Sequence, residues 1–257
     1  MNELFVTCLI ICPLIFLSGF IDSVAGGGGL ISLPAYLLAG FPPHIAAGTN
    51  KVVAGLGTAT ASIQYFKSGK ILLNIALISA AGAIIGSALG TKLALFIPEK
   101  MLGWIFLIVL PMAAIFLATR KNFGREDQTP KEYSALKQSV ISLLIGFFIG
   151  GYDGLVVVPG TGTFMILAFA GLLGLDLLMS SGCAKVSNFA SNITSAILFA
   201  FSGKVMFAVV IPAAICCILG SYAGSRYAIK GGSAKVKKVM YVVLALMFLK
   251  FASDFLH

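Results

Sequence analysis

Long apolar runs without a charged residue divide the chain into segments that are long enough to cross a bilayer. Four of these runs carry 18 to 21 residues each: Leu4–Ile21, Ile71–Thr91, Met101–Ala118 and Val205–Ser225. A membrane-spanning helix needs about 20 apolar residues. None of the runs shows the alternation of apolar and polar positions that is typical of membrane β-strands. The pattern therefore predicts an all-α polytopic membrane protein.

The same polar motifs occur twice along the chain, in the same order. In the first half, Asp22 is followed by a glycine run, "GTNK" ending at Lys51, "KSGK" and "GSALGTK". In the second half, Asp153 is followed by "PGTG", "GCAK" ending at Lys185, "SGK" and "GSYAGSR". From Gly48 onward the halves match at an offset of 134 residues, and the two aspartates match at 131. Five motifs in one order indicate an internal duplication.

The duplication predicts two membrane repeats, residues 1–119 and 138–257, joined by a basic cytoplasmic linker at residues 120–137. Each repeat is expected to contain a helix that ends at a glycine turn, a short apolar segment and three longer helices. Lys and Arg concentrate in cytoplasmic loops. If every basic segment lies on the cytoplasmic side, the two equivalent "SGK" loops lie on opposite faces of the membrane. We therefore expect inverted repeats of broken and full helices in the cell (inner) membrane, with both termini outside.

Glycine interrupts an apolar segment at the corresponding place in each repeat, in "AGGGGLISLP" (Ala25–Pro34) and in "VVPGTGTFMIL" (Val157–Leu167). Paired interruptions of this kind point to the substrate site of a transporter. A short helix that starts after such a break directs free N–H groups and a positive dipole end at its surroundings. Two such ends favour an anion site. The alternative interpretation is that the glycines serve only close helix packing.

Four charged residues lie inside apolar segments, namely Asp22, Lys51, Asp153 and Lys185. A lysine attracts an anion as a mobile point charge, so we expect both lysines to contact substrate. The aspartates have two interpretations: they take up a proton with the substrate, or they have a structural role, in which they accept hydrogen bonds from the amides of the glycine turns or pair with the lysines. The candidate substrate-binding residues are Gly26, Gly27, Gly28, Gly29, Asn50, Lys51, Gly160, Thr161, Gly162, Thr163, Lys185, Asn188 and Asn192.

These motifs resemble the TauE/SafE family of sulfite-exporter-like permeases and, within it, the YfcA-like branch. The likeness rests on "GFIDSVAGGGGLISLPAYLLAG", on "GTNK", on "YDG" with a Pro-Gly turn at Tyr152–Gly160, and on "AKVSNFASN" at Ala184–Asn192. The resemblance implies a multi-pass inner-membrane permease for sulfur-containing anions such as sulfite, sulfonates or related organic anions. The sequence departs from the family pattern at "VVVPGTG", where a more aromatic lead into the turn is expected.

Composition and missing motifs exclude several other classes of protein. Only 11% of the residues are charged, against about 25% in a soluble domain. Most of the net charge of +9 arises from basic connecting segments, which argues against a nucleic-acid partner. No Walker-type phosphate loop, no G-x-S-x-G motif and no G-x-G-D protease motif is present. The chain has five cysteines, namely Cys8, Cys12, Cys183, Cys216 and Cys217. They lack the spacing of metal ligands, so we expect no metal site. We also expect no cofactor and no enzymatic activity.

The sequence thus predicts a secondary transporter for a small anion, with the site between two glycine-broken half-helices. Protons are the candidate coupling ion. Two alternatives stay open at this point. Paired half-helices can also line the pore of an anion channel, and a membrane assembly protein would transport nothing. The sequence does not indicate the oligomeric state.

Overall fold

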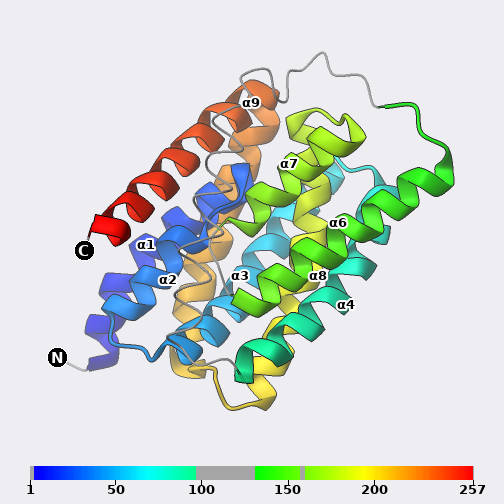
Figure 1. The fold of residues 1–257 in the computed structure, drawn as a ribbon. Coiled ribbons are helices and arrows are strands. Elements are labelled where there is room, and N and C mark those ends of the chain that lie inside the picture. Colours follow the sequence, from blue (N-terminus) through cyan, green and yellow to red (C-terminus); the bar gives the residue numbers. More distant parts are fainter. Residues whose placement is uncertain (1–2, 97–130, 157–159, 257) are drawn as a thin grey trace.

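The computed structural model describes residues 3–96, 131–156 and 160–256, and this part is built of helices joined by turns (Figure 1). The helices are α1 (Glu3–Ala25), α2 (Gly29–Leu38), α3 (Pro43–Lys67), α4 (Leu73–Phe96), α6 (Ala135–Val156), α7 (Thr161–Leu173), α8 (Leu177–Phe201) and α9 (Phe207–Leu256). The predicted segment Met101–Ala118 and most of the basic linker lie outside the described residues. The last three residues of the predicted linker already belong to α6.

Glycines of the duplicated motifs make equivalent close contacts in both halves. A Cβ atom on Gly86 of α4 would clash with the carbonyl oxygen of Phe147 in α6. A Cβ atom on Gly220 of α9 would clash in the same way with Phe16 in α1. The two glycines are 134 residues apart and the two phenylalanines 131, which are the offsets of the duplicated motifs. Helix α4 therefore packs on α6 as α9 packs on α1, so the internal duplication has a structural counterpart.

Helices α3 and α8 pack together at the centre and run in opposite directions. Gly48, near the start of α3, lies against the carbonyl group of Lys204 in the turn after α8. Its repeat equivalent Gly182, near the start of α8, lies against the carbonyl group of Lys70 in the turn after α3. The two equivalent loops thus lie at opposite ends of the molecule (Figure 1). This arrangement is the one predicted for inverted repeats.

Several basic segments share one end of the molecule. The Lys70 turn lies there beside the start of α8. The amide of Lys131 donates to the carbonyl oxygen of Leu173 at the end of α7 (3.0 Å). In the basic stretch of α9, the hydroxyl of Ser233 donates to Asp176, which precedes α8 (3.0 Å). The positive-inside rule predicts that this end faces the cytoplasm.

Helix α9 bends at Gly232, where φ is 67° and ψ is −170°. After the bend it turns back, and Val243 lies against Gly27 at the break between α1 and α2. The second half therefore contains all five predicted segments, because α9 supplies two of them. Figure 1 shows the two termini on the same side of the molecule.

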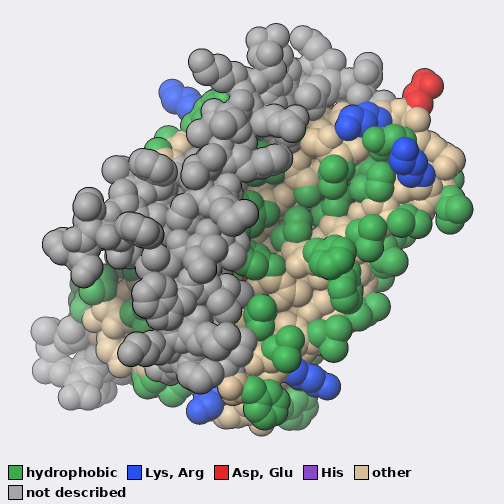
Figure 2. All heavy atoms as spheres, in the orientation of Figure 1, with side chains coloured by type: hydrophobic (Ala, Val, Ile, Leu, Met, Phe, Trp, Pro, Cys, Tyr) green, Lys and Arg blue, Asp and Glu red, His purple; other side chains and the backbone are tan. Residues whose placement is uncertain are grey.

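The outward faces of the paired helices are apolar. Leu77, Leu89 and Leu93 of α4 and Phe148 of α6 are each more than half exposed. Figure 2 shows hydrophobic side chains across the middle of this face, with Lys and Arg side chains toward the ends. Such a broad exposed apolar surface fits contact with lipid. In the described part, four helical segments are long and apolar enough to span a membrane: Thr7–Ala25, Leu73–Phe96, Ala135–Leu155 and Phe207–Val243.

Candidate functional site

The two central helices place one lysine each at equivalent positions. Helix α3 begins with Pro43, whose missing N–H group costs nothing at a first helical position. Helix α8 begins after Asp176, whose carboxylate accepts hydrogen bonds from two amides of the first turn. Lys51 and Lys185 are each the ninth residue of their helix. Both lysine side chains are buried, so each needs a partner inside the protein.

The two glycine breaks lie against one another in the interior. Positive φ angles at Gly26 (77°) and Gly160 (109°) turn the chain before α2 and α7. A Cβ atom on Gly26 would clash with the backbone of Gly162 and Thr163. The hydroxyl of Thr163 also donates to the carbonyl oxygen of Ala25 at the end of α1 (2.9 Å). The end of α1 and the first glycine break are therefore held against the start of α7.

The four charged side chains form two ion pairs that cross between the repeats, and all except the partly exposed Asp22 are buried. Lys51 of the first repeat lies 2.7 Å from Asp153 of the second. Lys185 of the second repeat lies 2.9 Å from Asp22 of the first. Asp22 also accepts a hydrogen bond from the amide of Gly28 in the glycine turn (3.3 Å). Asp22 thus contacts both a lysine and the glycine turn, and the pairing offsets part of the cost of removing these charges from water.

The Asp153 carboxylate accepts hydrogen bonds from two hydroxyl groups as well as from Lys51. Thr161 donates at 2.9 Å, and Ser191 of α8 donates to the second carboxylate oxygen. Ser191 is not among the residues predicted from the sequence. Its repeat equivalent is Gly57, so the duplication gave no signal there. The one available signal is its position between two predicted asparagines of "SNFASN".

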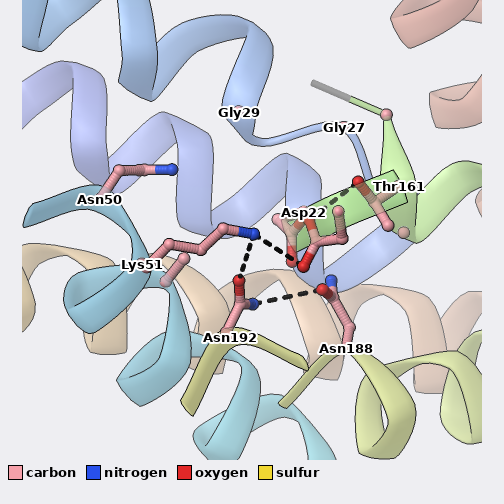
Figure 3. Close-up of a pocket in the computed structure, with 12 residues that line it drawn as sticks. Asp22, Gly27, Gly29, Asn50, Lys51, Thr161, Asn188 and Asn192 are labelled. Atoms are coloured by element: carbon pink, nitrogen blue, oxygen red, sulfur yellow. Dashed lines mark hydrogen bonds and ion pairs between the residues drawn. The ribbon is translucent and has the colours of Figure 1, made fainter. Parts of the chain in front are cut away.

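A chain of polar side chains continues from Lys51 along α8. The Lys51 ammonium donates to the side-chain oxygen of Asn192 (3.3 Å), and the amide of Asn192 donates to Asn188 (3.2 Å). Figure 3 shows these groups facing one another below the glycine break. An amide side chain both donates and accepts, so this row can hold either water or an anion beside the lysine.

These groups enclose a cavity of about 40 Å³, which is enough space for water. The lining residues are Asp22, Gly27, Gly29, Asn50, Lys51, Ala54, Asp153, Gly160, Thr161, Gly162, Asn188 and Asn192. Most of the predicted substrate-binding residues are therefore brought together. Ala54 was not predicted, although it is the repeat equivalent of Asn188.

Four predicted residues do not line the cavity. Gly26 packs against α7, and Thr163 donates to the end of α1. Gly28 donates to Asp22, and its carbonyl oxygen accepts from Ser18 (2.8 Å). Lys185 is fully buried behind Asp22. These four residues hold the two breaks in place rather than border the space between them.

The acidic side chains at the cavity already have partners within the protein. Both carboxylates that border it are paired with lysines. Within residues 3–96, 131–156 and 160–256, no group of three or more His, Cys, Asp or Glu side chains could hold a metal ion. All five cysteines carry free thiols.

Comparison with known proteins agrees with this architecture. The family described as "Sulfite exporter TauE/SafE" matches residues 11–251. The chain belongs to this family. It is 36% identical over 246 residues to "Probable membrane transporter protein ORF9" of Sinorhizobium sp, which covers 94% of this chain and 91% of that one. It is 31% identical over 257 residues to "Probable membrane transporter protein YfcA" of Escherichia coli K12, covering 98% and 94%. No solved structure matches the chain significantly.

Family membership and the helical architecture together make this chain a multi-pass membrane protein of a transporter family. A "Probable membrane transporter protein" of Haemophilus influenzae is 35% identical over 245 residues, covering 93% of this chain and 92% of that one. All three of these relatives are named as probable membrane transporters.

Proposed function

We propose that this protein is a secondary transporter that moves a small anion across the membrane through the cavity between its two half-helices. The observation that carries the proposal is a cavity beside Lys51 that is lined both by Gly29 at the start of α2 and by Thr161 at the start of α7. The first turn of a helix has N–H groups without an intrahelical acceptor and carries about half a positive charge. Two such ends and a lysine favour an anion over a cation or a neutral solute.

The cargo competes with a carboxylate for its place. Asp153 occupies the donors that an anion would use, namely the Lys51 ammonium and the Thr161 hydroxyl. Protonation of Asp153 would weaken its hold on Lys51, and the anion could then take over that contact. Protons are therefore the proposed coupling ion.

The carrier works by alternating exposure of the site. Inverted repeats allow two conformations in which the repeats exchange roles. The cavity borders Asn50 and Lys51 but not their repeat equivalents, Ala184 and Lys185. We therefore assign this structure to one of the two conformations. In the other, the cavity borders Ala184 and Lys185 instead, and it still borders both aspartates.

Sulfur-containing anions are the first cargo to test, because the family bears the name of a sulfite exporter. Labelled sulfite, thiosulfate and methanesulfonate are offered to proteoliposomes with and without a proton gradient. We expect saturable, gradient-dependent flux for the wild type. Lys51→Ala should lower that flux at least about tenfold, since a hydrogen bond to a charged group contributes about 1.5–3 kcal/mol.

The matched control is Lys92→Gln, which removes an exposed lysine from α4, and it should transport normally. Flux that does not saturate would indicate a channel. Absence of flux for all three anions in folded wild-type protein would contradict the proposed function.

Cysteine accessibility tests the alternation. In a background with the five native cysteines replaced by alanine, Asn50→Cys and its repeat partner Ala184→Cys are treated with a membrane-impermeant thiol reagent. At rest we expect only the Asn50→Cys thiol to react, from the end that carries Lys204. During transport the Ala184→Cys thiol should become reactive from the opposite end. Steady flux with an unreactive thiol at position 184 would rule out the alternation.

A further inference from the structure

The crossed ion pairs make the resting site electrically neutral, because two lysines face two aspartates across one interior region. Each aspartate also accepts a hydrogen bond from one of the two breaks. Gly28 of the first break donates to Asp22, and Thr161 of α7 donates to Asp153. An anion that enters this site adds a negative charge to a group of lysines and aspartates whose charges sum to zero. Burying an uncompensated charge is costly, so a second charge has to enter with it.

Only one of the two lysines is within reach of the cavity. Lys51 borders it together with Asn192. Lys185 has no exposed side-chain surface, and it is held by both the carboxylate and the backbone oxygen of Asp22. In this conformation the anion therefore meets a single ammonium group, and the carboxylate that it displaces belongs to Asp153.

The two aspartates differ in how well their surroundings tolerate a proton. Asp22 accepts from the Gly28 amide and the Lys185 ammonium, which can only donate. Asp153 accepts from the hydroxyls of Thr161 and Ser191. A hydroxyl group rotates and can accept instead. A protonated Asp153 can therefore donate its proton to a neighbouring hydroxyl group, whereas the two protein groups that contact the Asp22 carboxylate can only donate.

Few other ionisable side chains lie around Asp153 in the described part of the chain. Lys51 of α3 is its ion-pair partner, and Asp22 of α1 borders the same cavity with Lys185 of α8 behind it. Tyr152 is its neighbour on α6. Helices α4 and α7 approach α6 here through glycine, serine and threonine.

We propose that the site carries a monovalent anion together with one proton, and that Asp153 is the group that holds the proton. The inference rests on the proposed anion transport. One proton from water adds to one carboxylate oxygen of Asp153 on the side where the anion enters, and leaves on the other side. The charge moved per cycle is zero. A divalent anion beside Lys51, the one lysine that borders the cavity, would leave one negative charge uncompensated.

The test measures uptake of labelled methanesulfonate, which is monovalent, and of thiosulfate, which is divalent, under an imposed pH gradient or an imposed potassium diffusion potential. For the wild type we expect accumulation of methanesulfonate to follow the pH gradient and to change less than about twofold with 100 mV, whereas an uncompensated single charge would change it about 50-fold. Asp153→Asn should abolish the response to pH and make uptake sensitive to voltage.

Asp22→Asn is the comparison variant, because it changes the equivalent acid of the other repeat. Asp22→Asn should lower uptake, because Asp22 borders the cavity and pairs with Lys185. The uptake that remains should still follow the pH gradient and stay insensitive to voltage. Methanesulfonate uptake driven by voltage in the wild type, uptake of thiosulfate alone, or uncoupling by Asp22→Asn instead of Asp153→Asn would each overturn the inference while anion transport stands. Absence of uptake for every anion would overturn the proposed function itself.

Discussion

The Lys51→Ala variant is expected to lose stability and transport together, and the Lys51→Ala/Asp153→Ala double variant to regain stability alone. Removing one partner of a buried ion pair costs about 3–5 kcal/mol, because the other charge stays buried without compensation. Lys51 and Asp153 have side-chain exposures of 3% and 6%, so water cannot replace the missing partner. Removing both side chains leaves a small polar cavity but no buried charge without a partner.

Thermal unfolding in detergent and flux in proteoliposomes measure the two effects separately. One kcal/mol shifts the midpoint by about 2–4 °C in a chain of this size. The single variant should therefore melt roughly 10 °C below the wild type, and the double variant close to it. Lys204→Ala, in an exposed turn, should match the wild type in both measurements. Flux restored in the double variant would mean that Lys51 serves only to neutralise Asp153, and its contact with the anion would be ruled out.

The duplication and the two breaks were predictable because they depend on spacing along the chain. Glycine runs stop a helix locally, and equal offsets between motifs mark equivalent places in two repeats. The distribution of charge predicted that the two repeats are inverted, since Lys and Arg concentrate in cytoplasmic loops. The structure agrees at Gly48 and Gly182, which lie against equivalent loops at opposite ends.

The crossing of the ion pairs was not predictable from spacing. Lys51 and Asp153 are 102 positions apart, and Lys185 and Asp22 are 163 apart. Each lysine pairs with the acid of the other repeat because α3 and α8 run in opposite directions through the centre. That relation arises from the packing of the whole molecule. Ser191 was missed for a related reason, because its role depends on the position of α6 beside α8.

The sequence could not predict that the cavity borders only one of the two equivalent lysines. The duplication makes Lys51 and Lys185 equivalent, and the prediction treated them alike. The cavity borders Lys51 and not Lys185. This difference depends on the conformation of the protein. Equivalent residues can therefore differ in role at a given moment, which is what exchange of roles between inverted repeats requires.

Gly26→Ala is expected to be among the most damaging single substitutions in the chain, and Gly40→Ala is its matched control. Both glycines have positive φ, at 77° and 84°. A side chain in this backbone region costs about 1–2 kcal/mol. At Gly40 that is the whole cost, since a Cβ atom would meet nothing within 4 Å. At Gly26 the new Cβ would also collide with the backbone of Gly162 and Thr163, which cannot yield as a flexible side chain would.

The difference between the two variants therefore measures how tightly the breaks are packed. Gly40→Ala should lower the midpoint of thermal unfolding by a few degrees, at about 2–4 °C per kcal/mol, and leave flux unchanged. Gly26→Ala should give several times that shift or little folded protein. Any folded fraction should be without flux, because the start of α7 would move away from that of α2. Equal shifts for both variants would show that the two half-helices are not held against one another, and the anion site between them would lose its structural basis.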